Sequence, residues 1–260
     1  MSATTDRRRN PPPEVSIPLV YEPLVEERQA GPSIRTDRRD LEARPIFLNT
    51  GLITQANGSG YIEAGGVKIA CSVYGPRPKP PPYSSEGSLN LEVKFAPFAS
   101  DPRRAPLRDT EPLPLSILLT QLLLPTIHLH RLPKSIIDVH LLILESDTLS
   151  NVLSAGLNVA SAAVADAGIE MAGLGVGNVV SKLKNGKVVL DPTKDEEVES
   201  EAKVMVGTMP AVGKVTDLWL TGEIAIDEAC LMIEKAITAS RETHAILGQT
   251  LIEGAEERGV

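Results

Sequence analysis

Hydrophobic residues along this chain change between two spacings in an order that leaves few folds open. They recur at every second residue from Leu89 to Phe95 and again from Ile137 to Ile143, which is the spacing of strands with one buried face. Elsewhere they recur at helical spacing, from about Asp109 to Leu124 and from Leu149 to Ala163. Strands and helices that alternate in this way predict an α+β protein.

Turn residues predict three hairpins in the same pattern. The first has Ala64, Gly65 and Gly66 between strand-like stretches at 60–63 and 67–74. Asn185-Gly186 is the strongest short-range hairpin signal, because both residues accept the positive φ that a tight turn needs. A third turn is expected near 210–213. The chain therefore reads as two halves of similar build.

The two ends of the chain differ from its middle. Residues 1–40 carry many prolines amid mixed charge, which predicts an extended N-terminal arm that docks on a partner, followed by one domain over 41–260. A last helix is expected, with a charged tail that frays. Its buried face is predicted to hold Ala229, Met232, Ile233, Ala236 and Ile237.

Composition excludes several classes of protein. The chain has 260 residues, 42% of them hydrophobic, which suffices for one large domain. Its longest apolar run, from Leu113 to Leu124, is shorter than the ~20 residues that a membrane helix needs. No secretory signal is recognisable, so the protein is expected to stay inside the cell, without membrane contact. Cys71 and Cys230 lie in apolar patterns, so neither a disulfide nor zinc is expected, and no cofactor is predicted.

Charge points to one region that can face nucleic acid. The net charge is −8, but bases outnumber acids between Pro76 and Lys134. The candidate RNA-binding residues there are Lys94, Arg103, Arg104 and Arg108. The alternative is a solvated loop, with Arg108 paired to a neighbouring acid.

Two other groups of residues invite a metal-site interpretation. Acids are concentrated between Asp191 and Glu201, but without a recognisable ligand spacing, so a solvated hairpin edge is the favoured interpretation. His128, His130 and His140 have no matching cysteine pair and are expected to be ordinary surface or packing residues. No metal site is therefore predicted.

Several motifs, in order, resemble the RNase PH family. They cover roughly Arg35 to Ile246, nearly the whole chain. Arg35-Thr36-Asp37-Arg38-Arg39 is similar to an RxDGR element, with Arg38 where the family has glycine. The other matching segments are Arg44-Pro45-Ile46, NGSGYIEAGGVKIACSVYGPRP, RLPKSIIDVHLLILESD, ADAGIEM, LDPTKDEEVESEAKVMVG and DLWLTGE.

The resemblance implies a fold and a role. The fold would be RNase PH-like, with ribosomal-protein-like βαβα halves and mixed sheets packed with helices. The pattern looks most like the fungal form of a ring subunit of the eukaryotic RNA exosome. Its partners would be other RNase PH-like ring subunits, KH or OB-fold cap subunits, and RNA in the central channel. Its location would be the nucleus, nucleolus and cytoplasm.

The same resemblance implies that this chain does not catalyse. Active members place an arginine in the loop before the helix that begins near Leu149, where it grips phosphate. Here no arginine, lysine or histidine occurs from Ser146 to Ser181. The family's catalytic aspartate aligns with Lys203, and its acidic pair with Glu196-Glu197. Two alternatives stay open: a metal-dependent or phosphorolytic 3′-to-5′ exoribonuclease, and a free-standing RNA-binding module.

Overall fold

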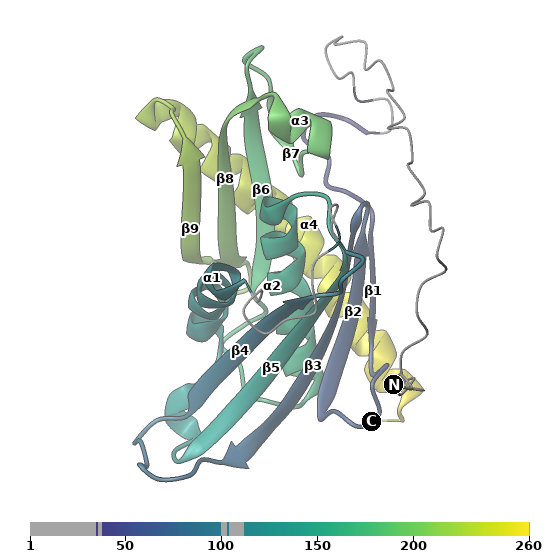
Figure 1. The fold of residues 1–260 in the computed structure, drawn as a ribbon, viewed down its shortest axis with the longest axis vertical. Helices are drawn as coiled ribbons and strands as arrows, with labels where there is room; N and C mark the ends of the chain where they lie inside the picture. Colours follow the sequence, from purple (N-terminus) through teal and green to yellow (C-terminus); the bar gives the residue numbers. More distant parts are fainter. Residues whose placement is uncertain (1–34, 36–37, 100–102, 104–111, 260) are drawn as a thin grey trace, which may run out of the picture. The chain divides into compact units, whose positions relative to one another are not determined.

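Five strands form the first sheet (Figure 1). The order across the sheet is β1 (Ile46–Thr50), β2 (Gly58–Ala64), β3 (Val67–Pro78), β5 (Ser135–Glu145) and β4 (Ser88–Phe95). Only β4 and β5 pair in parallel. In β4, Leu91 and Val93 are buried whereas Lys94 is exposed, which confirms the period-two prediction. The β2–β3 turn contains Gly65 at φ +58°, which a glycine adopts without strain.

Four strands form a second sheet, in the order β7 (Val188–Leu190), β6 (Val176–Leu183), β8 (Ser200–Met209) and β9 (Lys214–Gly222). All neighbours are antiparallel. Both hairpins predicted for this half are confirmed, and Gly186 and Gly213 take positive φ in their turns. Helix α2 (Leu149–Asp166) lies between the two sheets in Figure 1, and every residue from Ser150 to Val164 is buried.

Polar side chains on α2 complete the hydrogen bonding of β6. Strand β7 pairs only with residues 180–182 of β6, so the preceding backbone needs other partners. Ser154 Oγ donates to the Gly177 carbonyl over 2.7 Å, and the Gly177 amide donates to Asn158 Oδ1 over 2.8 Å. The Gly175 amide donates to Ser161 Oγ over 2.8 Å. The helix is therefore joined to β6 by specific bonds as well as by apolar contact.

Two further helices pack against the sheets. Helix α1 (Leu113–Leu123) lies along β4, where Ser116 Oγ accepts from the Val93 amide over 3.2 Å. Helix α4 (Ile226–Glu257) packs on β6 and β8 through Met232 and Ala236, and its later turns reach β1. The expected fraying of its tail is wrong. Its last turns pack on the β1–β2 region, and Arg258 just beyond them pairs with the buried Asp166.

The structure is a computed structural model that describes residues 35, 38–99, 103 and 112–259. These belong to one compact unit, Ser33–Val260. The α+β fold class is confirmed, whereas the predicted arm over residues 1–40 lies outside the described residues except for residues 35 and 38–40, and it stays a prediction. Among these described residues, three short helices complete the fold: η2 (Leu124–Thr126), η3 (Leu129–Arg131) and α3 (Lys194–Val198). In the part of the chain that is described, no helix is long and apolar enough to cross a membrane.

Candidate functional site

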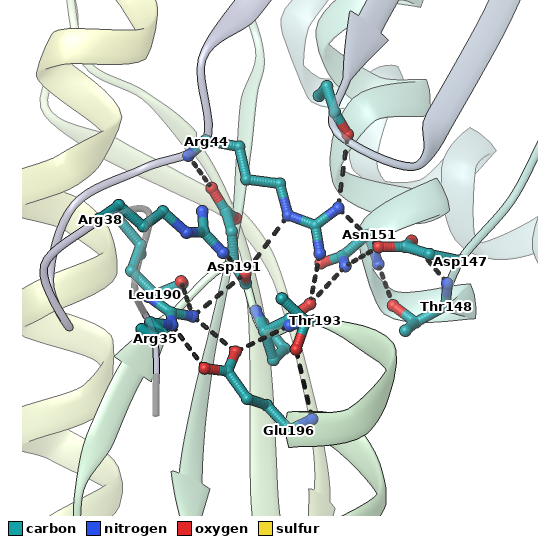
Figure 2. Close-up of polar contacts among 12 residues, drawn as sticks. Arg35, Arg38, Arg44, Asp147, Thr148, Asn151, Leu190, Asp191, Thr193 and Glu196 are labelled. Carbon is teal, nitrogen blue, oxygen red and sulfur yellow. Dashed lines mark hydrogen bonds and ion pairs between the residues drawn. The ribbon is translucent and has the colours of Figure 1, made fainter. Parts of the chain in front are cut away.

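A network of buried and partly buried polar side chains lies where the segment that begins at Arg35, the start of α2 and the loop after β7 meet (Figure 2). Arg35 forms a two-pronged ion pair with Glu196, with Nε 2.6 Å from Oε1 and Nη2 2.9 Å from Oε2. The side chains of Arg35 and Glu196 are 6% and 1% exposed. Arg35 Nη2 also donates to the Leu190 carbonyl over 2.7 Å. A bidentate pair of this kind fixes orientation as well as charge.

Glu196 has a second role in the short helix α3. The Thr193 amide donates to its Oε2 over 2.8 Å, and its own amide donates to Thr193 Oγ1 over 3.4 Å, which makes a reciprocal cap. Burial acts to raise the pKa of Glu196, but the bonds from Arg35 and Thr193 outweigh it and lower that pKa below its usual value. The interpretation of this acidic segment as a solvated hairpin edge is therefore wrong at Glu196.

Arg44 joins the same region from the opposite side. Its Nη2 donates to the Pro192 carbonyl over 2.6 Å, and its backbone amide donates to Asp191 Oδ2 over 3.2 Å. Arg38, the arginine at the family's glycine position, donates to the Asp191 carbonyl. Burial, together with the charges of Arg35 and Arg44, lowers the pKa of Arg38 to about 10, so it stays protonated at neutral pH.

Asp191 lies at the centre of these arginines in an unusual backbone conformation. Its φ is +47°, a region that aspartate tolerates better than most residues. Loss of solvation raises the pKa of its carboxyl, although the Arg44 amide and the nearby arginines oppose that effect. The conformation turns the chain out of β7 and aims the carbonyls of 190–192 at the guanidinium groups.

The loop before α2 has no cation of its own, as the sequence indicates, but a distant arginine reaches it. Arg44 Nη1 lies 2.5 Å from Asp147 Oδ2. The Thr148 amide donates to Asp147 Oδ1 over 2.6 Å, and Asn151 Nδ2 donates to Oδ2 over 3.1 Å. Thr148 caps the helix by accepting from the Asn151 amide over 3.3 Å. Asp147 is thus held by three donors.

Lys203 and Glu197 form a second charged pair nearby. Lys203, on β8, makes an ion pair with Glu197, and both side chains are mostly buried, at 22% and 16% exposed. Ser150 Oγ, in the first turn of α2, lies 3.3 Å from Glu197 Oε1. The carboxylate of Glu197 therefore has a cation and a hydroxyl as close partners.

Metal binding has little support in these surroundings. Within residues 35, 38–99, 103 and 112–259 there is no group of three or more His, Cys, Asp or Glu side chains placed to hold an ion. Glu196 and Glu197, the adjacent acids of the acidic segment, are both engaged by cations. His128 and His130 contact each other edge to face, and His140 lies 3.2 Å from Glu92.

The predicted RNA-binding residues lie apart from this region in the chain. Lys94 is on the exposed side of β4, with Nζ 3.4 Å from Glu92 Oε2. Arg103 is exposed in the loop between β4 and α1. Arg104 and Arg108 lie outside the described residues. Their role stays a prediction.

Comparison with known proteins identifies the family. The first domain of the 3′ exoribonuclease family, RNase PH, matches residues 42–170. "Exosome complex component mtr3" of Schizosaccharomyces pombe is 34% identical, over 95% of this chain and 96% of its own length. The chain belongs to the RNase PH family. The human "Exosome complex component MTR3" is also 34% identical, over 98% of this chain and 97% of its own length.

Structural similarity agrees on the fold. The crystal structure of rice (Oryza sativa) Rrp46 superposes with a TM-score of 0.73 at 21% identity, over 83% of this chain and 98% of the other. The RNase PH-like fold predicted from the motifs is confirmed.

RNase PH motifs that looked separate in the sequence meet in the site. The RxDGR-like segment, the Arg44-Pro45 dipeptide and the acidic segment supply Arg35, Arg44 and Glu196 to one network. Sequence reasoning did not assign roles to Asp147 or Asp191. The position of both residues within family motifs was the only sequence signal for a role, because their contacts in the site join residues far apart in the chain.

Proposed function

We propose that this chain is a non-catalytic structural subunit of the RNA exosome core. It pairs with other RNase PH-like subunits, completes their hexameric ring and lies beneath KH or OB-fold cap subunits. RNA threads through the central channel for 3′-to-5′ processing and degradation of rRNA, mRNA and other RNAs. The full-length similarity to exosome components supports this assembly. The nucleus, nucleolus and cytoplasm are the proposed locations.

One observation carries the proposal that the subunit is non-catalytic. Lys203 stands where the resemblance places a catalytic aspartate, and its ammonium is paired with Glu197. A lysine in an ion pair neither coordinates a metal ion nor accepts a proton at neutral pH, and those are the tasks of a catalytic carboxylate. Because Glu197 is paired with Lys203, its carboxylate is also less available to replace the missing catalytic aspartate.

RNA contact belongs to the same proposal at a second location. Lys94 and Arg103 are exposed, and with Arg104 and Arg108 they are proposed to hold backbone phosphates without reading sequence. The alternative of a 3′-to-5′ exoribonuclease that uses the acids between 191 and 201 is less well supported. Three of those acids are in ion pairs: Glu196 with Arg35, Glu197 with Lys203 and Glu201 with Lys182.

The test separates assembly from catalysis. The full-length chain is co-expressed with the other ring and cap proteins, and the purified complex is assayed for stoichiometry. The isolated chain is incubated with 3′-labelled RNA, with magnesium and either with or without inorganic phosphate. We expect stoichiometric assembly and no RNA shortening in either buffer. Phosphate-dependent release of nucleoside diphosphates, or magnesium-dependent decay that Glu197→Gln abolishes, would contradict the proposal.

A further inference from the structure

The loop between β3 and β4 contains four exposed residues that the proposed function does not use, Pro80, Pro81, Pro82 and Tyr83 (Figure 1). Pro81 and Pro82 are joined by a cis peptide bond. Tyr83 is 62% exposed, so most of a large aromatic side chain lies outside the core. Prolines lack the amide hydrogen that strand pairing needs, so this segment cannot extend the neighbouring sheet. The loop presents three rigid rings and one aromatic ring together at the surface.

The backbone of Lys134 holds the two ends of this segment together. The Lys79 amide donates to the Lys134 carbonyl over 2.8 Å, and the Lys134 amide donates to the Ser84 carbonyl over 3.3 Å. The Lys134 ammonium also lies 5.6 Å from the centroid of the Tyr83 ring, which is a cation–π contact. The fold therefore fixes the segment at both ends and leaves residues 80–83 outside the sheet.

Groups that a partner can bind are also available around this segment. In the described part of the chain, no donor is hydrogen-bonded to the carbonyl groups of the three prolines. Lys79 and Lys134 place positive charge at its two ends, and neither has an ion pair with a described residue. A partner is therefore expected to supply hydrogen-bond donors and an acidic rim.

We infer that residues 80–83 are a docking site for a partner protein with a WW-type domain, whose groove is lined by aromatic side chains. Such grooves pack aromatic rings against proline rings, and one class of WW domain binds segments of the form Pro-Pro-x-Tyr. Residues 80–83 have that form. Rigid prolines lose little conformational entropy on binding, and Tyr83 supplies a large anchor with a polar tip.

This partner is neither a ring subunit nor a cap subunit, so the site goes beyond the proposed assembly. Nucleic acid fits the segment less well, because it offers one aromatic ring for stacking, whereas single-stranded RNA is usually held by several. The prolines have no donor with which to bind phosphate.

The experiment titrates an isotope-labelled WW domain of the Pro-Pro-x-Tyr-binding class with the full-length chain and follows the amide shifts of the domain. A free peptide of residues 76–86 is the reference ligand, because it carries the segment without the conformation that the fold imposes. We expect saturable shifts in the groove of the domain with both ligands. Tyr83→Ala, and Pro80→Ala combined with Pro81→Ala, should each weaken binding by the full-length chain at least about tenfold.

Phe98→Ala is the matched control, because Phe98 is an aromatic residue of similar exposure, 68%, outside this loop. It should bind the domain as wild type does. All the substituted residues are exposed, so the variants are expected to fold, and their thermal unfolding midpoints check this.

Three results would overturn the inference. The first is a peptide that binds while the full-length chain does not, because the fold then hides the segment. The second is binding that survives Tyr83→Ala or the double proline variant. The third is no binding of the domain by either ligand. If a single-stranded RNA probe then binds wild type but not Tyr83→Ala, the loop contacts RNA instead.

Discussion

At the scale of single residues, Arg35 and Glu196 join two segments that are 161 positions apart in the sequence. Both are nearly inaccessible to water, so removing one partner leaves a buried charge without its counter-charge. We expect Glu196→Gln to lower the free energy of unfolding by roughly 3 kcal/mol. Combining Arg35→Met with Glu196→Leu should recover part of this loss, as measured by urea denaturation.

Acid titration checks the same pair. The folded pKa of Glu196 lies below its unfolded value of 4.5, so its contribution to stability is complete above that pH and disappears as pH falls through the folded pKa. Glu196→Gln should therefore lose less stability than wild type below about pH 4.5. Glu199→Gln, at the residue that follows the same short helix, should follow wild type. An unchanged acid profile in Glu196→Gln would show that the pair does not stabilise the fold.

At the scale of elements, periodicity predicted most strands and helices because it is a local property. The residues from Leu89 to Phe95 and from Ile137 to Ile143 do lie in strands. Their alternating apolar and polar residues predict this, because successive side chains of a strand point to opposite faces. The network around Asp191 was not predictable in this way, since its bonds join distant segments and depend on a positive φ. Glu196 illustrates the error that results. Its neighbours in the sequence are acidic and suggest a solvated position. Its side chain is nevertheless buried and pairs with Arg35, which is distant in the sequence.

The contact between α2 and β6 gives a prediction at this scale. A Cβ at Gly177 would lie 3.0 Å from Ser154 Cα and 3.0 Å from Met205 Cε, so Gly177→Ala forces the helix and the strand apart. We expect a loss of about 1–3 kcal/mol in the free energy of unfolding. Gly248→Ala is the matched control, because that helical glycine has no atom within 4 Å of its Cβ position. It should stabilise α4 by up to about 1 kcal/mol, and a similar gain in Gly177→Ala would contradict the close approach.

At the scale of the whole described fold, two connections hold the sheets and α2 together. One is the network of Arg35, Arg38 and Arg44, which ties the chain before β1 to the loop after β7. The other is α4, which begins against the second sheet and ends near β1. In both, polar bonds supplement an apolar core that already spans the sheets and α2. The arginine network thus helps to hold the fold together, and acidic side chains of the same chain balance its positive charges.

The far end of α4 tests the second connection. Arg258 pairs with Asp166 at the end of α2, and Asp166 also accepts from the Ser59 amide of β2 over 2.9 Å. The Asp166 side chain is 2% exposed whereas that of Arg258 is 44% exposed, so solvent screens part of the attraction. We expect Arg258→Gln to cost about 1 kcal/mol and to speed amide exchange selectively in the last turns of α4. Arg241→Gln, on the same helix but without an ion pair to a described residue, should leave exchange there unchanged. Equal exchange in both variants would mean that packing alone holds the end of α4 in place, without help from the ion pair.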